Sequence, residues 1–414
     1  MSKVQSVRGT YDLYGEAKRK AKKVIAAGSN VVEKYGFEEI ETPIFEFTEV
    51  FARNLGDTSD IVTKEMYCFE DRGGESLTLR PEGTAGVVRA FISEGMQQNL
   101  PVKMYYAGPM FRYERPQKGR QRQFTQFGVE LLGVETPQAD VEVIAMAYEF
   151  IESLGLAGTV TVEINSLGDK ESRDAYREKL VAYLKENYEK LSEDSKARLE
   201  KNPLRVLDSK EECDKEVVAG APLYQDSLNE ASKSFFNAVL KGLDMLGIKY
   251  RVNNRLVRGL DYYSHTVFEL VTDKLGAQGT VLAGGRYDGL VEQMGGGKVP
   301  GIGWACGVER LSMLLDADVS LPRPVAVIPV GEDADAKALE ISYMLRKAGF
   351  RVEQAYSGNL KKRMIKANKA NASKAVIIGS DELADGNVTV KDLDSGEQQT
   401  VALNKLIEGL KLWI

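Results

Sequence analysis

Histidine is almost absent from this chain of 414 residues, in which His265 stands alone. A Ser-His-Asp triad, a Cys-His pair or a zinc site with several imidazoles would have to use His265 or not exist. His265 lies in a strand-like stretch, with no cysteine or acid at metal-ligand spacing. We therefore interpret it as a polar or surface side chain and expect no protein metal site.

Cysteine and long apolar runs are scarce as well. Cys68, Cys213 and Cys306 are far apart and form no CxxC pair, which predicts a reducing compartment and no metal cluster. Five lysines and arginines between residues 18 and 23 stand where an apolar leader would lie, and no run approaches the length of a membrane span. The sequence thus predicts a cytoplasmic protein without membrane association.

Positive charge is slightly outnumbered, with 55 Lys+Arg against 61 Asp+Glu and a net charge of −6. This balance excludes a globally basic nucleic-acid binder, but the charge is uneven. Residues 323–414 carry 14 Lys+Arg against 12 Asp+Glu, a net of +2, and residues 359–374 carry six positive charges and no negative one. We interpret 359–374 as a candidate surface for a nucleic-acid backbone, with a solvated helix face as the alternative.

The first half of the chain predicts an antiparallel sheet rather than a doubly wound one, because strands and helices do not alternate there. A helix is predicted over 16–35, followed by a strand-like stretch over 37–42 that runs into Pro43, which favours a sheet edge or an interface. Turn residues and apolar alternation then predict two hairpins, with strands at 67–69, 77–79, 104–112 and 123–132.

The remaining chain changes character twice, and its length allows two or three domains in all. From 169 to 216, charges of both signs at helical spacing predict a small helical insertion. Beyond Pro322 and Pro324 the pattern strand–helix–strand–helix–strand predicts a separate domain with parallel strands. Its elements are predicted at 325–330, 334–348, 351–355, 359–370 and 375–378, after strands at 257–272 and 301–305.

The strand at 123–132 carries a candidate binding face. Gln126, Gly128 and Glu130 share one parity, while the intervening apolar residues share the other and predict a core face. An amide and a carboxylate separated by glycine leave room for a small polar ligand. A solvated sheet face is the alternative.

Arginines gather near this strand. Arg112 ends the preceding strand, and the loop after it carries Arg115, Lys118, Arg120 and Arg122. Guanidinium groups match carboxylates and phosphates, so this loop is a candidate clamp for an acidic substrate, with a solvated hairpin tip as the alternative.

Other segments combine glycine or a helix start with charge. Thr84 is a candidate helix cap, and the Glu82 carboxylate suits an ammonium group. Gly301 and Gly303 lack side chains, so a flat base could lie on the sheet at this strand. The helix that follows carries Arg310.

Taken together, these segments resemble the histidyl-tRNA synthetases, and the resemblance runs through the whole chain in order. FEEIETPIFE is similar to motif 1 of class II synthetases, MFRYERPQKGRQRQFTQFGVELLG to motif 2 and GIGWACGVERL to motif 3. LVRGLDYY and AGGRYDGL resemble the two signatures that distinguish the histidine-specific enzymes from other class II synthetases.

The resemblance implies an α+β fold with two domains. These are a class II catalytic domain at 1–322, with a helical insertion at about 170–250, and a C-terminal α/β anticodon-binding domain at 323–414. The implied activity is the activation of L-histidine with ATP and its transfer to tRNA(His). The implied cofactor is Mg²⁺ bound with ATP, and the implied assembly is a homodimer built partly through motif 1.

The resemblance also implies roles for individual residues. Arg112 and Arg258 would be the catalytic residues and would also belong to the histidine-binding set. Arg112 would bridge the amino-acid carboxylate and the ATP α-phosphate, and Arg258 would support the α-phosphate. Arg120 would meet the outer phosphates and Arg310 would pack along the nucleotide. Histidine would be held at its ammonium group by Glu82, Thr84 and Gln126, at its imidazole by Glu130 and Tyr263, and along the pocket by Tyr262 and Tyr287.

One alternative has the same fold but no catalysis: an inactive paralogue that serves as the regulatory subunit of ATP phosphoribosyltransferase. Such proteins lose signature residues and usually lack the anticodon domain. Here the C-terminal domain is present, and so are the signature residues Arg112, Glu130, Arg258 and Arg310. The sequence therefore favours the active enzyme.

Overall fold

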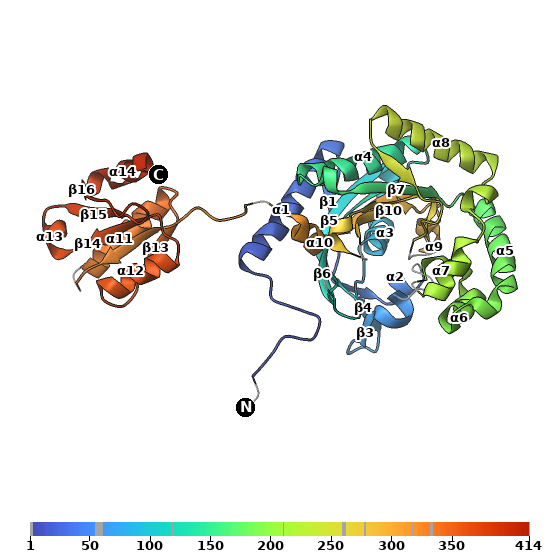
Figure 1. The fold of residues 1–414 in the computed structure, drawn as a ribbon, viewed down its shortest axis with the longest axis horizontal. Helices are drawn as coiled ribbons and strands as arrows, with labels where there is room; N and C mark the ends of the chain where they lie inside the picture. Colours follow the sequence, from blue (N-terminus) through green and yellow to red (C-terminus); the bar gives the residue numbers. More distant parts are fainter. Residues whose placement is uncertain are drawn as a thin grey trace. The chain divides into compact units, whose positions relative to one another are not determined.

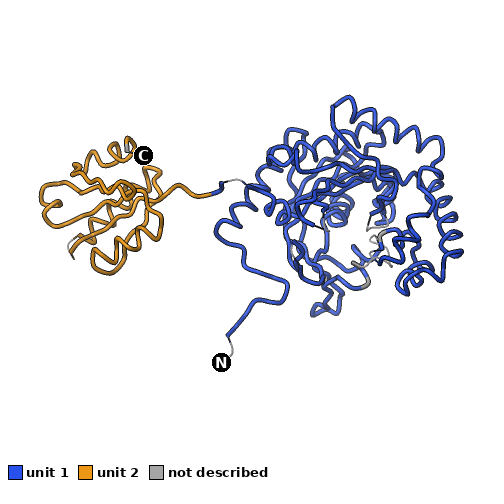
Figure 2. The backbone as a smooth tube through the Cα atoms, in the orientation of Figure 1, with its two compact units in different colours: residues 1–319 blue, residues 320–414 orange. Residues whose placement is uncertain are grey.

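The computed structural model describes residues 3–53, 61–117, 119–209, 211–258, 262–276, 279–316, 318–331 and 334–413. The chain divides into two compact units, residues 1–319 and 320–414 (Figure 2). Within the described ranges, no helix is long and apolar enough to cross a membrane. Each unit has its own sheet, and the predicted α+β class is confirmed.

An eight-stranded sheet forms the centre of the first unit, in the order β1-β5-β6-β11-β10-β9-β7-β8 (Figure 1). Its inner pairs, from β5 to β7, are antiparallel, whereas β1 pairs with β5 and β8 with β7 in parallel. The strands are β1 Glu38–Glu39, β5 Val102–Phe111, β6 Gln123–Leu132, β7 Thr161–Ser166, β8 Tyr250–Val252, β9 Ser264–Val271, β10 Thr280–Arg286 and β11 Gly301–Gly307. The predicted hairpin of β5 and β6 is confirmed, while the strand predicted at 37–42 is reduced to β1 at the sheet edge.

Four helices cover one face of this sheet: α1 Gly15–Val32, α4 Pro137–Ser153, α8 Glu230–Met245 and α10 Val308–Leu314. Phe127, Val129 and Leu131 of β6 are buried against them, so the predicted core face of this strand is confirmed. The helix predicted at 16–35 ends as α1 and one 3-10 turn, at Gly36, whose left-handed φ of 78° is typical of a helix end. The opposite face of β6 is therefore left for Gln126 and Glu130.

The region predicted as helical, 169–216, contains α5 Lys170–Glu186, α6 Glu193–Lys201 and α7 Glu212–Ala219. The buried Asp214 carboxylate joins α7 to α6, because it accepts hydrogen bonds from the hydroxyls of Ser192 (2.7 Å) and Ser195 (2.6 Å). These helices share a core with one another and with the wall of the pocket, whereas α8 packs on the main sheet.

A smaller sheet, in the order β2-β4-β3, lies beside α2 Glu49–Ala52 and before α3 Thr84–Ser93. Its strands are β2 Phe45–Phe47, β3 Tyr67–Glu70 and β4 Ser76–Leu79, which confirms the first predicted hairpin. Phe45, Phe47 and Phe69 are 54%, 48% and 44% exposed, and Phe47 and Phe69 both lie opposite Leu77 in register. We call these three phenylalanines the phenylalanine face.

The second unit has the mixed sheet β13-β12-β14-β15-β16, in which β12 pairs in parallel with β13 and β14. Alternate residues of β12 face two cores, one against α11 and the other against α12, so helices cover both sheet faces. Every element predicted from 325 to 378 is confirmed. The elements are β12 Val325–Pro329, α11 Ala334–Lys347, β13 Val352–Gln354, α12 Leu360–Lys369, β14 Lys374–Ile378, α13 Ser380–Ala384, β15 Asn387–Asp392, β16 Gln398–Ala402 and α14 Leu406–Trp413.

The basic stretch 359–374 is only partly a surface. Arg363 is buried and donates to the backbone carbonyl of Pro329, and Lys374 is buried beside its cross-strand neighbour Asp392, with which it forms an ion pair. The exposed positive charges of this stretch are Lys361, Lys362, Lys366 and Lys369, which we call the α12 lysine face.

His265 is not a surface residue, which corrects part of its interpretation. It lies half-buried near the start of β9, with its ring 4.9 Å from that of Phe235, and burial lowers its pKa. Its φ of 47° occurs where the pairing of β9 with β10 shifts register. His265 is a structural residue of this bulge and lies outside the pocket described next.

Candidate active site

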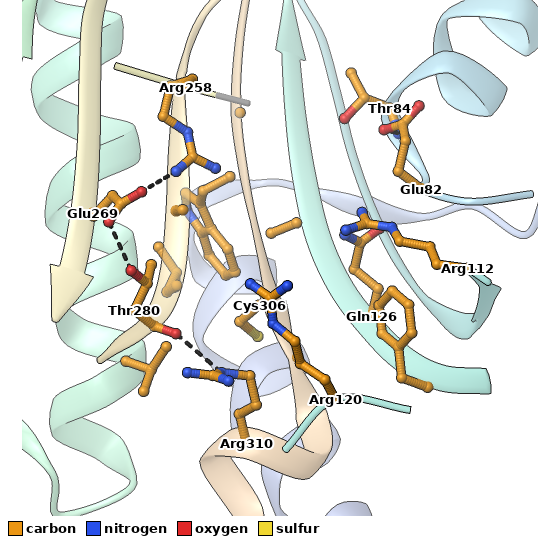
Figure 3. Close-up of a pocket in the computed structure, with 18 of the residues that line it drawn as sticks. Glu82, Thr84, Arg112, Arg120, Gln126, Arg258, Glu269, Thr280, Cys306 and Arg310 are labelled. Atoms are coloured by element: carbon orange, nitrogen blue, oxygen red, sulfur yellow. Dashed lines mark hydrogen bonds and ion pairs between the residues drawn. The ribbon is translucent and has the colours of Figure 1, made fainter. Parts of the chain in front are cut away.

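The face of the eight-stranded sheet opposite helices α1, α4, α8 and α10 holds a pocket of about 510 Å³ (Figure 3). All of the residues predicted to bind histidine or ATP line this one pocket: Glu82, Thr84, Arg112, Arg120, Gln126, Glu130, Arg258, Tyr262, Tyr263, Tyr287 and Arg310. They come from segments more than two hundred residues apart in the sequence. The sheet therefore gathers the predicted site, although the role of each residue remains a prediction.

Glu130 is a buried carboxyl group in the pocket wall. Its carboxyl group accepts hydrogen bonds from the hydroxyls of Thr84, at 2.7 Å, and of Tyr287, and it is 1% exposed. Burial raises the pKa of Glu130 to about 8, since the charged form loses its hydration. Protonated or charged, Glu130 is a hydrogen-bonding group in the wall of the pocket.

Glu82, and not Thr84, caps α3, which corrects the predicted cap. The two carboxylate oxygens of Glu82 accept from the backbone N–H groups of Thr84 (2.7 Å) and Ala85 (2.8 Å), because Gly83 occupies the cap position and has no side chain. The Thr84 hydroxyl is thereby left to donate to Glu130. Burial raises the pKa of Glu82 as well.

The space predicted above three glycines is filled by this chain itself. A side chain at Gly128 would overlap the ring of Tyr106, its neighbour on β5, and one at Gly301 would overlap Tyr287. A side chain at Gly303 would overlap the Glu130 carboxylate. The predictions of an open floor at Gly128 and of a base lying over Gly301 and Gly303 are therefore wrong. These glycines make room for the side chains that shape the pocket.

Arginines from several segments line the same pocket. Arg112 is fixed through its Nε, which donates to the Pro81 carbonyl at 2.8 Å, and Arg120 pairs with Glu114 at 2.9 Å. Elsewhere in the loop, Arg115 is exposed and Arg122 lies over the ring of Tyr113, 3.7 Å from its centre. Lys118 lies outside the described residues. The loop is thus divided between a pocket wall and a solvated tip.

Two further arginines are joined through residues that the sequence did not single out. Arg258 forms an ion pair with Glu269 of β9, and the Thr280 hydroxyl donates to the other carboxylate oxygen of Glu269 at 2.7 Å (Figure 3). Arg310 donates from Nε to the Thr280 carbonyl at 3.0 Å. The sequence does hold a signal for this arrangement. Glu269 is a lone carboxylate in the apolar run of β9, and such a residue needs a cationic or hydrogen-bonding partner.

Tyr287 is anchored from behind by a buried ion pair. Its neighbour Arg286 is fully buried and pairs with Asp140 of α4, which is also fully buried. Arg286 also donates to the Val134 carbonyl at 2.9 Å. The signature AGGRYDGL therefore points one side chain into the core and the next into the pocket.

Among the described residues, no group of three or more His, Cys, Asp or Glu side chains is arranged to hold a metal ion. The pocket carboxylates Glu114 and Glu269 each pair with an arginine. A magnesium ion that arrives on ATP, held by phosphates and water with few protein ligands, fits this set of donors.

A family model described as histidyl-tRNA synthetase matches residues 9–311. The chain belongs to the histidyl-tRNA synthetase family. A second model, described as an anticodon binding domain, matches residues 324–413.

Relatives support this family along the whole chain. Histidine–tRNA ligase of Rhodospirillum rubrum is 60% identical over 411 residues, 99% of each chain. That of Gluconacetobacter diazotrophicus is 56% identical over 404 residues, 98% of this chain and 97% of the relative. The crystal structure of apo histidyl-tRNA synthetase from S. aureus has a TM-score of 0.82 and 37% identity, and covers 99% of this chain and 100% of that one. The resemblance predicted from the motifs is confirmed, and these full-length similarities give no support to the regulatory-subunit alternative.

Proposed function

We infer that this chain is a histidine–tRNA ligase, which activates L-histidine with ATP and then transfers it to tRNA(His). The observation that carries this function is that one pocket combines a buried carboxyl group with several cations. Glu130 and four arginines all line it. An amino acid with a hydrogen-bonding side chain and a nucleotide with several anionic groups complement this set of side chains.

Recognition of histidine rests on Glu130 and the hydroxyls around it. We propose that the imidazole N–H donates to Glu130, with Tyr263 at the other ring nitrogen and with Gln126, Thr84 and Glu82 near the ammonium group. An analogue without these nitrogens would leave buried polar groups unpaired, which disfavours it by roughly 10⁴-fold. Discrimination of that size needs no separate editing site.

The first step joins two anions. A carboxylate oxygen of histidine attacks the α-phosphorus of ATP, the bond from that phosphorus to the β-bridging oxygen breaks, and pyrophosphate leaves. No general base is required, because the carboxylate is already a nucleophile. We propose that Arg112 and Arg258 stabilise the charge that develops, and that Arg120 and Arg310 hold the outer phosphates and the nucleotide. One fixed donor of this kind typically contributes about 3–4 kcal/mol.

Magnesium enters this proposal with the ATP. It neutralises phosphate charge when bound, and Glu114, the carboxylate nearest the loop arginines, is the protein group best suited to approach it. The arginines bind and orient the substrates in the same pocket.

The second step transfers histidine to the tRNA. A ribose hydroxyl of the terminal nucleotide attacks the carbonyl carbon of the adenylate and loses its proton to water, the bond from that carbon to the phosphate oxygen breaks, and AMP leaves. The second unit matches an anticodon-binding model, and we propose that its α12 lysine face contacts the tRNA backbone. Because charged tRNA is used by translation, we place the enzyme in the cytoplasm.

We also propose a homodimer, with the phenylalanine face as part of its interface. Three large apolar side chains exposed on one sheet face are typical of a protein contact. Strand β2 of this sheet overlaps the end of the segment that resembles motif 1, which the family uses for its dimer.

Histidine-dependent exchange of label between pyrophosphate and ATP tests the function directly. We expect exchange with histidine and none with the other amino acids or with histidine omitted. Exchange supported by another amino acid, and not by histidine, would refute the substrate assignment.

A further inference from the structure

We propose that Glu269 is a positioning residue that holds Arg258 in place for amino-acid activation, and that Thr280 fixes Glu269 in turn. This inference rests on the proposed function, since it takes Arg258 to stabilise the α-phosphate. It assigns a task to two residues of the pocket wall that do not need to touch substrate.

The first support is the ion pair that Arg258 forms with Glu269. The guanidinium group also interacts with Tyr263, whose ring centre lies 5.8 Å from its central carbon. Among the described residues, its buried Nε has no hydrogen-bond partner. One edge of the guanidinium is thus tied to the sheet, and other donor positions are left for an incoming anion.

The second support is how firmly Glu269 itself is held. It belongs to the strand β9, and its side chain is only 15% exposed. One carboxylate oxygen takes Arg258 and the other takes the Thr280 hydroxyl. A carboxylate bound at both oxygens has a defined orientation, so it can transmit that orientation to the arginine.

The third support is a β-bulge that brings Thr280 into range. The register of β10 with β9 shifts between Thr280 and Leu282, so Thr280 and Ala283 lie on one face of the sheet although they are three residues apart. The Thr280 carbonyl accepts from Arg310 at 3.0 Å. The same residue therefore fixes Arg258 through its side chain and Arg310 through its backbone.

The test uses the full-length protein with Glu269→Gln, Glu269→Ala and Thr280→Val. We expect the kcat of histidine-dependent exchange to fall by about 10-fold in Glu269→Gln and, because a misplaced catalytic group is costly, by about 100-fold in Glu269→Ala. Thr280→Val, which removes one hydrogen bond, should cost about threefold. The KM for histidine should stay within about twofold in each, because Glu130 and the hydroxyls that bind it are untouched.

Glu163→Gln is the matched control. Glu163 lies directly opposite Glu269 on β7, is 7% exposed and pairs with Arg251, but it is absent from the described wall of the pocket. Glu163→Gln also removes one negative charge, at the position paired with Glu269 on the neighbouring strand. This variant should keep wild-type kinetics. Comparing the melting temperatures of the variants with that of wild type separates misfolding from misplacement of Arg258.

A double-mutant cycle with Arg258→Ala decides whether Glu269 acts through Arg258. If it does, adding Glu269→Gln to Arg258→Ala causes no further loss, whereas independent roles give multiplied losses. Multiplied losses, or a Glu269→Gln enzyme as fast as Glu163→Gln, would overturn the inference and leave the proposed function standing. A wild-type protein and a Glu163→Gln variant that both lack histidine-dependent exchange would overturn the function and this inference with it.

Discussion

Replacing Glu130 by glutamine should change how the stability of the first unit depends on pH. The pKa of Glu130 is raised from 4.5 to about 8, mainly by burial. A raised folded-state pKa means that the protonated form stabilises the fold, fully below about pH 4.5 and progressively less as the pH rises through about 8. At about 1.4 kcal/mol per pH unit, wild type should lose about 4 kcal/mol of unfolding free energy from this group between about pH 5 and about pH 9.

Glutamine keeps the size of the side chain and can still bind both hydroxyls, with its oxygen accepting from one and its NH2 donating to the other, but it does not titrate. The variant should therefore lack this slope and be more stable than wild type near pH 9, while its affinity for histidine falls. Urea unfolding followed across this pH range, with histidine binding measured by calorimetry, gives both quantities. Glu152→Gln, at an exposed position of α4, controls for the loss of one negative charge. Wild-type and Glu130→Gln curves that stay parallel would refute the reasoning from burial.

Four shorter predictions concern the rest of the chain. Arg258→Ala should lower the kcat of exchange by on the order of 10²–10³ while histidine binding, measured by calorimetry, stays nearly intact; unchanged kinetics would remove Arg258 from the mechanism. His265→Asn should keep activation within about twofold, because asparagine tolerates a positive φ and the ring contacts no substrate; a large loss of rate would contradict its structural role. Alanines across the α12 lysine face should weaken tRNA binding by about tenfold or more and lessen its salt dependence, measured by filter binding, and they should leave pyrophosphate exchange unchanged. Phe47→Glu should produce monomers in analytical ultracentrifugation, since a charge buried in an apolar contact is costly, and a stable dimer in this variant would exclude the phenylalanine face from the interface.

The sequence predicts strands and helices correctly where the pattern of apolar residues shows which faces are buried. Phe127, Val129 and Leu131 alternate with Gln126 and Glu130, and a strand with one core face must show this period of two. The strands and helices of the second unit are predicted equally well. Helices cover both faces of its sheet, so its strands are continuously apolar and alternate with amphipathic helices.

The sequence does not predict contacts between distant segments. The residues around Gly128 do not indicate that Tyr106 fills the space beside it, and those around Thr84 do not indicate that its hydroxyl donates to Glu130. Lys374 was counted as surface charge, yet it shares a strand face with the buried Val376 and Ile378. Its parity was a signal, but its partner Asp392 becomes visible only once β14 and β15 are paired.

The glycine at position 303 limits how the amino acid accepted by this pocket could change over evolution. Any side chain there would overlap the Glu130 carboxylate, so a mutation that narrows the pocket at this point also displaces the group that we propose to bind the imidazole. A lineage drifting toward a smaller amino acid would have to alter position 130 first, and that intermediate would discriminate poorly among substrates. That intermediate would attach wrong amino acids to tRNA, so selection against errors in translation would act against this change.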